Sequence, residues 1–584
     1  MLASLGRAVT PALCAIAGST FFLSIILGLG GAVQSALGAV SRGTQTISGS
    51  VTSDDGRPVA FAAVRLVDVD TSKTFFAETD ADGHFSFVGP HAALYSLVAS
   101  KSGFVAATYG EFRVRGAGTP IVLSVGEVLD GLTIRVRREA VIFGTVRRPD
   151  GVPLGAVVVR VLEPTIVSSG RRELLAVRTG VTDDRGAYEI AGIPPGQYFV
   201  KAVPAVGIPI SLSEITARPT DAGAHVLPVV SQSHARLQGY AASYYPGSIH
   251  ASGAEMISVL AGERRRGIDI GLTVVYGASV EGRIVGHGSP PVLRSGEVVL
   301  APSDPYQDPI AVKRAKVSFD TFAIYDVFPG DYVLRASTRS SLVDGPELRA
   351  SARIIVTAGA DHKGINLVLL PASSLRGTLT FDGSAKMPPE ASFSISLDPV
   401  TIEGGDGAVG LPVRGDVLPD GSFHFTSVWP GRYRIVFMLT SGSEGWVTKS
   451  VTVEGREVEN CLLDIGPGEH RSDVLLNLTA RMGRVVGTLR DSMDQPATKY
   501  TVILFPSNRA SWSPLSRRTV AVRPTNTGAF SVDRVPFGDY LLAVVDDPAS
   551  NEWLLPDFLE TLVPMSTTLT VSNQATTEVR LKVK

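Results

Sequence analysis

The sequence contains little cysteine, little tryptophan and little net charge. Only two of its 584 residues are cysteines, Cys14 and Cys461, so disulfide bonds do not hold its domains together. A formal net charge of −2 gives no electrostatic basis for binding nucleic acid or an anionic membrane surface. Only four tryptophans are present, which is few for an array of sugar-binding sites that stack aromatic rings on sugars.

Motifs for catalysis and metal binding are also missing. The nine histidines are scattered, and none forms His-Glu-x-x-His or another metal-ligand spacing. There is no Gly-x-Ser-x-Gly elbow and no Gly-x-x-x-x-Gly-Lys phosphate loop. Residues 78–83 loosely resemble a calcium loop, but Gly89 stands where the bidentate Glu is required. We therefore expect no enzyme activity, no cofactor and no metal, although a catalytic triad assembled only in three dimensions stays open.

What the sequence does contain is a repeat in which an aromatic residue is followed ten positions later by a tyrosine. Hydrophobic residues stand two positions after each member of the pair, which is the period of a strand with one buried face. Glycines before most of these positions predict tight turns, and the side chains of Asp80, Asp183 and Asp420 are expected to bond to their own turns. The repeat tyrosines themselves are expected in the core or bracing a turn. The five pairs are Phe85/Tyr95, Tyr188/Tyr198, Phe322/Tyr332, Phe423/Tyr433 and Phe530/Tyr540.

Further strands flank each copy of the repeat. A glycine-containing strand opens each copy, at residues 47–51, 142–146, 280–284, 375–379 and 485–489. A short alternating strand closes each copy, at residues 132–136, 268–272, 365–369, 474–478 and 579–583. The sequence therefore predicts an all-β fold of about five tandem Greek-key β-sandwich domains, each of roughly seven strands, after an N-terminal hydrophobic helix.

The spacing of the copies predicts one domain for each. Linkers between copies are almost absent, which favours a semi-rigid rod over flexibly joined domains. The second domain is longer because of a polar insertion around residues 211–243. The expected domains are 45–137, 138–275, 276–370, 371–479 and 480–584.

The repeated pattern resembles a known family. Gly-x-[Phe/Tyr]-x-[hydrophobic] followed by Pro-Gly-x-Tyr, after a Gly-Thr-Val strand and an Asp-Gly turn, is similar to the carboxypeptidase regulatory-like domain. The resemblance is good over the first two copies, fair over the last two and weakest over the third. It implies a transthyretin-like β-sandwich, classed with carbohydrate-binding-like folds, and a bacterial envelope setting. It implies no catalytic residue, because in carboxypeptidases this domain accompanies a separate catalytic one.

Residues 1–40 have the pattern of a signal peptide or a membrane anchor. Arg7 is the only charged residue before Arg42, and a long apolar run lies between them. Small residues from Ser35 onward suit signal cleavage, but the run is also long enough to span a bilayer, so both readings stay open. Either one predicts a secreted, periplasmic or cell-surface protein, in contact with a membrane only through this segment.

Aromatic residues on predicted loops are the candidate ligand-binding residues. They would stack on the apolar faces of sugar rings, although packing inside the fold is their commoner role. Cys461 is expected to pack rather than react, because no partner residue is near it in sequence. The candidates for stacking are Tyr244, Tyr245, Trp446, Trp512 and Trp553.

Three functions are consistent with these patterns. The preferred one is a non-catalytic spacer or interaction module of the bacterial cell envelope, whose edge strands accept a partner strand. Its partner would be an envelope protein or a glycan. The first alternative is carbohydrate or peptidoglycan binding through the loop aromatics. The second is a hydrolase, or a regulatory partner of a peptidase or an outer-membrane transporter.

Overall fold

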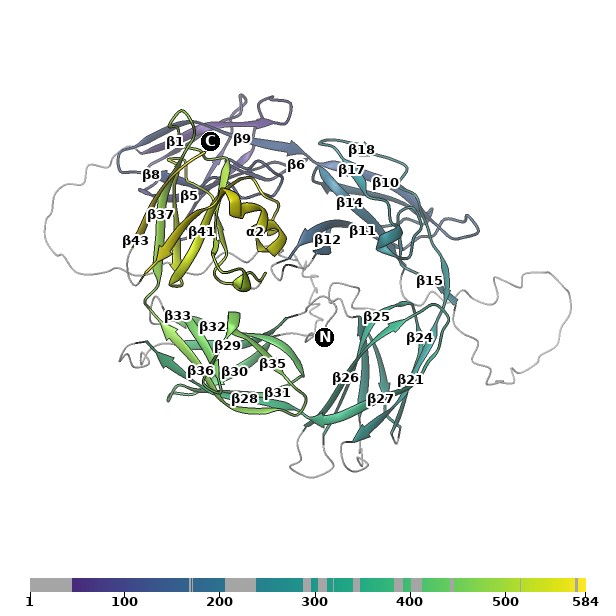
Figure 1. The fold of residues 1–584 in the computed structure, drawn as a ribbon. Coiled ribbons are helices and arrows are strands. Elements are labelled where there is room, and N and C mark those ends of the chain that lie inside the picture. Colours follow the sequence, from purple (N-terminus) through teal and green to yellow (C-terminus); the bar gives the residue numbers. More distant parts are fainter. Residues whose placement is uncertain are drawn as a thin grey trace, which may run out of the picture.

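The computed structural model describes residues 45–167, 170, 172–204, 238–286, 296–302, 312–318, 320–339, 347–382, 392–400, 412–441, 446–514, 516–572 and 576–583. Its strands surround five separate hydrophobic cores, so the predicted all-β tandem fold is confirmed (Figure 1). We call the five groups of strands modules 1 to 5. The hydrophobic helix expected in residues 1–40 lies outside the described residues. Across the part of the chain given above, no helix is long and apolar enough to cross a membrane.

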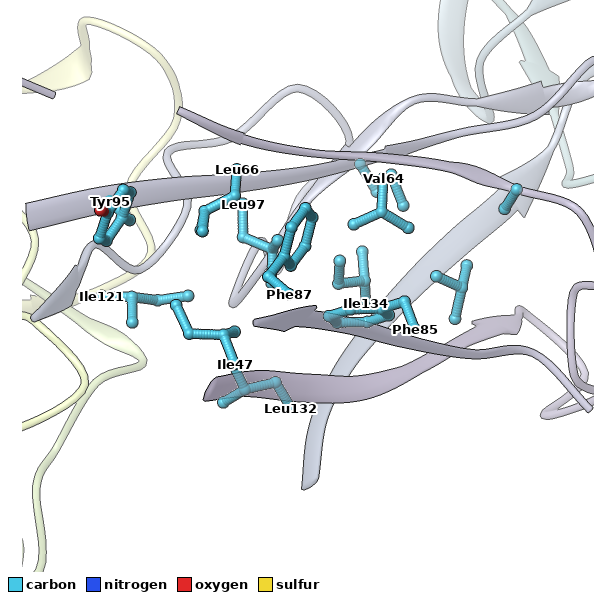
Figure 2. Packing of buried hydrophobic residues seen from close by; sticks show 14 of the residues in the cluster. Ile47, Val64, Leu66, Phe85, Phe87, Tyr95, Leu97, Ile121, Leu132 and Ile134 are labelled. Atoms are coloured by element: carbon cyan, nitrogen blue, oxygen red, sulfur yellow. The ribbon is translucent and has the colours of Figure 1, made fainter. Parts of the chain in front are cut away.

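Module 1 packs two sheets face to face. One sheet has the order β4-β1-β9-β6, and the other has the order β3-β2-β5-β7 with β8 also paired to β5. Its first and last strands, β1 and β9, run parallel. The rings of Phe85, Phe87 and Tyr95 lie in the core between the sheets (Figure 2). The strands are β1 (Thr46–Ser53), β2 (Ala63–Asp68), β3 (Thr74–Glu78), β4 (His84–Val88), β5 (Ala93–Ser100), β6 (Phe104–Val105), β7 (Ala107–Thr108), β8 (Ile121–Leu123) and β9 (Val128–Arg138).

Module 2 repeats this plan with shorter closing strands. Its first strand β10 pairs with β13 on one edge and, in parallel, with β18 and β19 on the other. The second sheet is β12-β11-β14-β16, with β17 also on β14. The elements are β10 (Ala140–Arg147), β11 (Val158–Ile166), β12 (Arg172–Val181), β13 (Ala187–Ile193), β14 (Gly196–Val203), β15 (Gln238–Tyr240), β16 (Ser243–Tyr244), η1 (Ala251–Gly253), β17 (Ile257–Val259), β18 (Arg264–Arg265), β19 (Ile270–Gly271) and β20 (Val274–Tyr276).

Module 3 is one continuous sheet folded around its core. The strand order is β23-β22-β25-β26-β27-β21-β24, because β26 pairs with both β25 and β27 and so joins the two halves. Its seven strands match the expected number. They are β21 (Ala278–Gly286), β22 (Glu297–Pro302), β23 (Lys313–Lys316), β24 (Thr321–Val327), β25 (Gly330–Arg339), β26 (Glu347–Val356) and β27 (His362–Pro371).

Module 4 is also continuous, with nine strands in place of the expected seven. The order is β34-β33-β36-β28-β31-β30-β29-β32-β35. The elements are β28 (Ser373–Phe381), β29 (Ser392–Pro399), β30 (Val413–Val417), β31 (Ser422–Val428), β32 (Gly431–Ser441), β33 (Val447–Val453), β34 (Arg456–Val458), η3 (Glu459–Cys461), β35 (Leu462–Ile465) and β36 (His470–Thr479).

Module 5 adds helices to its seven strands. The sheets are β40-β37-β43 and β39-β38-β41-β42, and α2 lies between β41 and β42 in sequence. A second apolar cluster joins Leu559 and Leu562 of α2 to Phe505 and Trp512. The elements are β37 (Gly483–Arg490), β38 (Tyr500–Pro506), η4 (Arg509–Ser511), β39 (Val520–Val522), β40 (Ala529–Val535), β41 (Gly538–Asp546), η5 (Glu552–Leu554), α2 (Pro556–Leu562), η6 (Val563–Met565), β42 (Thr567–Val571) and β43 (Thr576–Lys582).

The repeat tyrosine braces the same turn in all five modules. Each hydroxyl donates a hydrogen bond to the backbone carbonyl four residues earlier, just before the tyrosine strand. All five rings are buried, so the predicted core and turn-bracing role is confirmed. Burial also raises the pKa of each tyrosine to about 12. The bonds are Tyr95 to His91 (2.7 Å), Tyr198 to Pro194 (2.7 Å), Tyr332 to Phe328 (3.0 Å), Tyr433 to Trp429 (2.9 Å) and Tyr540 to Pro536 (2.7 Å).

The glycine of the opening strand is required by the strand beside it. A Cβ atom at this position would lie only 1.9 to 2.5 Å from a backbone carbonyl oxygen of the last strand or, in module 2, of the residues between β18 and β19. Only glycine therefore lets the first and last strands approach this closely. The five positions are Gly49, Gly144, Gly282, Gly377 and Gly487.

The aspartate turns form as predicted. The carboxylate Oδ1 of Asp80 accepts a hydrogen bond from the amide of His84 at 2.8 Å. Asp183 does the same for Ala187 at 2.8 Å. The backbone of its own turn thus occupies the carboxylate of Asp80, as expected for a turn rather than a calcium loop.

The five modules are arranged in a closed ring, with module 5 beside module 1 (Figure 1). The expected semi-rigid rod is therefore wrong. Short linkers do limit the motion of each module relative to the next, but they do not keep the chain straight. Side-chain contacts between residues far apart in sequence join the modules and hold module 5 against module 1.

Candidate functional site

The contact that closes the ring is built around Asn526 of module 5. This residue lies in the turn between β39 and β40 and bonds to the edge strand β8 of module 1. The amide of Val122 donates to Asn526 Oδ1 at 2.8 Å, and Asn526 Nδ2 donates to the Val122 carbonyl at 3.2 Å. The amide of Asn526 donates to the carbonyl of Pro120 at 2.9 Å. Because β5 occupies the other edge of β8, Asn526 takes the place of the next strand.

A buried arginine supports this contact. Arg523 is 8% exposed and donates through Nη2 to the carbonyl of Gly110 in module 1 at 3.1 Å. Its Nη1 donates to Asp547 Oδ1 at 3.0 Å, and Arg113 of module 1 approaches the other oxygen of Asp547 at 3.4 Å. Burial lowers the pKa of Arg523, and Asp547 opposes that shift. The guanidinium also lies 5.6 Å from the ring centre of Phe112.

Module 5 makes further contacts of the same chemistry with modules 2 and 4. Asn551 of module 5 donates through Nδ2 to the carbonyl of Ile166 in module 2 at 2.8 Å. Arg517 of module 5 donates to the carbonyls of Thr448 and Lys449 in module 4. At each of these contacts a polar side chain of module 5 bonds to a backbone carbonyl of another module. Such bonds orient two modules without needing an apolar interface.

The joint between modules 3 and 4 uses an aromatic residue. Arg349 of module 3 donates to the carbonyl of Ser427, and its guanidinium lies 4.7 Å from the ring centre of Trp429 in module 4. Arg335 lies 5.8 Å from the same ring. The ring of Trp429 thus packs against two arginines of the neighbouring module.

Two of the predicted stacking residues lie under the helix of module 5. Trp512 is 9% exposed, donates through Nε1 to the carbonyl of Pro506 at 2.7 Å and meets Phe505 edge-on. Trp553 is partly buried against the same cluster. These positions stabilise α2 on the sheet and leave Trp512 with little surface for a sugar.

The other three predicted stacking residues lie in two further modules. Trp446 is half-buried in module 4 and meets Phe381 edge-on at 5.0 Å. Tyr245 packs partly against the core of module 2, and the Nζ atom of Lys201 lies 4.9 Å from the ring centre of Tyr244. The structure therefore brings only Trp512 and Trp553 together, and sugar stacking by these five residues stays a prediction.

A shallow cavity of about 510 Å³ lies on module 3. Its lining includes Arg283, Lys316, Ser318, Lys363 and Asn366. Lys363 already faces Glu281 at 3.8 Å. The charges suit a weakly held anion, and the lining contains no histidine or cysteine that would carry catalysis.

Elsewhere in the described part of the chain, metal-ligand clusters are absent and the thiol of Cys461 is buried. Within the described ranges, no group of three or more His, Cys, Asp or Glu residues is placed to hold a metal ion. Cys461 is 3% exposed in the core of module 4, and burial raises the pKa of its thiol. The prediction that Cys461 packs is confirmed.

Comparisons with known proteins agree with the fold of the first module. The family model described as carboxypeptidase regulatory-like domain matches residues 46–126, which confirms the resemblance for that part of the chain. No curated protein matches the sequence.

Similar solved structures include three pilins. One is a streptococcal ancillary pilin, 12% identical, covering 53% of this chain and 99% of that chain with a TM-score of 0.19. Another is GBS52, the minor pilin of Streptococcus agalactiae, which is 14% identical. The match covers 39% of this chain and 95% of that chain, with a TM-score of 0.21. The third is BcpA, the major pilin subunit of Bacillus cereus, which is 12% identical. The match covers 56% of this chain and 99% of that chain, with a TM-score of 0.15. At these scores the likeness carries no argument about function.

Proposed function

We propose that this protein is a non-catalytic structural and interaction module of the bacterial cell envelope, held rigid by closure of its five modules into a ring. The match of residues 46–126 to the carboxypeptidase regulatory-like domain and the signal-like residues 1–40 support the location. The observation that carries the proposal is the contact of Asn526 and Arg523 with module 1. Its partner is an envelope protein or a glycan.

Closure explains how separate modules act as one body. In an open chain, bending at any one joint moves everything beyond it. In a ring, the contact between β8 and Asn526 opposes bending at every joint, because the last module is tied to the first. The ring therefore suits a scaffold that holds binding surfaces at set distances, rather than a flexible tether.

The experiment opens the ring and measures its dimensions. Asn526→Ala combined with Arg523→Met removes the hydrogen bonds of both side chains to module 1, each contributing about 1 kcal/mol. We expect a larger radius of gyration and a larger maximum dimension in small-angle X-ray scattering, with an unchanged circular dichroism spectrum. Asn366→Ala is the matched control, because Asn366 is exposed on module 3, away from the closure contact.

Two results would count against the proposal. Unchanged dimensions in the double variant would mean that this contact does not hold the ring. Turnover of an esterase, peptidase or glycosidase substrate, abolished by a substitution in one module, would overturn the non-catalytic part. Cell fractionation of chains with and without residues 1–40 tests the envelope location separately.

A further inference from the structure

The last strand of each module has two edges, and in four modules another segment bonds to at least part of the second edge. One edge always pairs in parallel with the first strand of the module, as β9 does with β1. The other edge pairs along Leu475–Thr479 with β33 in module 4. In module 1 it pairs with β6 only at Arg137 and Arg138, and in module 3 with β26 only at Leu370 and Pro371. In module 2, the amide of Gly271 in β19 donates to the carbonyl of Pro246 at 3.0 Å.

Module 5 differs at this edge. Among the residues that the structure describes, β43 pairs with β37 alone. In modules 3 and 4 the chain after the tyrosine strand continues into the strand that covers this edge. In module 5 the chain after β41 instead forms η5, α2 and η6, and α2 covers the outer face of the other sheet. Within the described ranges, the second edge of β43 is therefore left without a strand.

The uncovered edge also exposes part of the core. Val579, Leu581 and Val583 are only partly buried. Their counterparts in module 4 are fully buried, at 0% exposure each. An unpaired strand edge with apolar side chains at alternate positions is a template for another strand. Figure 1 shows β43 at the outer rim of the ring, where such a strand has access.

We propose that a second copy of this chain covers the edge, through antiparallel pairing of two β43 strands about a two-fold axis at Val579. In this register Glu578 of each copy lies opposite Arg580 of the other, so the pairing forms two ion pairs on the exposed face. Val579 meets its own counterpart on the inner face, and Leu581 lies opposite Thr577. The same strand thus complements itself in charge and in apolar character, as a two-fold interface requires.

The charges also select this register. Moving the axis by one residue, to Arg580, would place the two Arg580 side chains opposite each other. An axis midway between two residues would pair the exposed face of one strand with the inner face of the other. The inference concerns assembly and does not rest on the proposed envelope role.

The test compares the mass of the purified full chain and of charge variants by sedimentation velocity over a range of concentrations. We expect a dimer for the unaltered chain and at least a tenfold weaker dimer for Arg580→Glu, which places like charges opposite each other. The double variant Glu578→Arg with Arg580→Glu restores opposite charges and is expected to restore the dimer. Arg376→Glu is the control, because Arg376 is exposed on β28, which is paired on both edges.

A cross-link locates the axis independently. In a Cys14→Ser background, Val579→Cys is expected to form a disulfide-linked dimer on mild oxidation, and Arg376→Cys is not. A monomer at all concentrations, or a dimer unaffected by Arg580→Glu, would overturn the proposal. Failure of the double variant to dimerise, with an unchanged circular dichroism spectrum, would overturn the register.

Discussion

Modules 4 and 5 carry the same aromatic–tyrosine repeat and complete their sandwiches differently. In module 4 the strand β33 pairs with the last strand β36, and all nine strands form one sheet around the core. In module 5 a helix takes the place of that strand in the chain and adds a second apolar cluster, while β43 pairs on one edge alone among the residues that the structure covers. The repeat thus specifies the two faces that form the core, and residues outside it decide how the edges are covered.

Removing the helix contact of module 5 is expected to have the largest effect. Trp512→Ala leaves a cavity between α2 and the sheet and should lower the free energy of unfolding of module 5 by about 3–5 kcal/mol. Hydrogen exchange of α2 and β41, followed by mass spectrometry, should become faster while β28 of module 4 is unaffected. Trp446→Ala is the control. Because Trp446 is only half-buried, its replacement should lower the free energy of unfolding of module 4 by less. Equal losses of unfolding free energy in Trp512→Ala and Trp446→Ala would contradict this difference between the two modules.

The opening glycines should tolerate alanine differently in the two modules. A Cβ atom added at Gly377 would lie 2.2 Å from the carbonyl oxygen of Val474. A Cβ atom added at Gly487 would lie 2.5 Å from the carbonyl oxygen of Val579. The strand β36 is held on both edges and cannot move away, whereas β43 is held on one. We expect Gly377→Ala to cost about 3 kcal/mol and Gly487→Ala about 1 kcal/mol. Both losses of stability are measured by unfolding in urea, with hydrogen exchange in β28 and β37 as the probe. A larger loss for Gly487→Ala than for Gly377→Ala would refute the explanation.

The repeat tyrosines should behave alike in both modules. Tyr433→Phe and Tyr540→Phe each remove one hydrogen bond to a backbone carbonyl, so each should lower stability by about 1 kcal/mol at pH 7. Because each folded-state pKa is about 12 and the unfolded value is about 10, the tyrosines favour the folded state below pH 10. That contribution is lost as the pH rises from 10 to 12.

Each phenylalanine variant should therefore lose less stability than the unaltered chain over this range of pH. Thermal unfolding measured at pH 7, 10 and 12 tests the difference. Clearly unequal losses of stability in Tyr433→Phe and Tyr540→Phe would show that the turn is braced differently in the two modules.

The thiol of Cys461 reports on module 4 with no expected change in stability. Because the thiol is buried and its pKa is raised, a Cys14→Ser chain should react with a thiol reagent only after unfolding. Gly377→Ala should accelerate the reaction and Gly487→Ala should not, because Cys461 lies in the core of module 4 alone. Rapid reaction in the otherwise unaltered chain would mean that this core opens readily.

The repeat was sufficient to predict the strands and their turns because its signals are local. Alternation places Phe423 and Phe425 on the same face of one strand, and both are buried. The carboxylate of Asp80 bonds to a residue four positions away, and Tyr433 bonds four positions back. Such contacts need no knowledge of the rest of the chain.

The candidate site depended on contacts that no short stretch of sequence contains. Asn526 meets Val122 across 404 positions, and nothing near either residue marks the pairing. Trp512 looked like a loop aromatic, but α2 covers it. The seven residues of α2 are too short to form a helix alone, so packing on the sheet holds it in place.

Periodicity and turn chemistry within about a hundred residues were therefore enough to predict the strand-rich modules and the braced tyrosine turns. Ring closure, the helix over module 5 and the open edge of β43 arise only when the modules meet in space. The physical reason is that hydrogen bonds to a distant backbone carbonyl depend on how the modules are oriented, and orientation leaves no periodic trace in the chain.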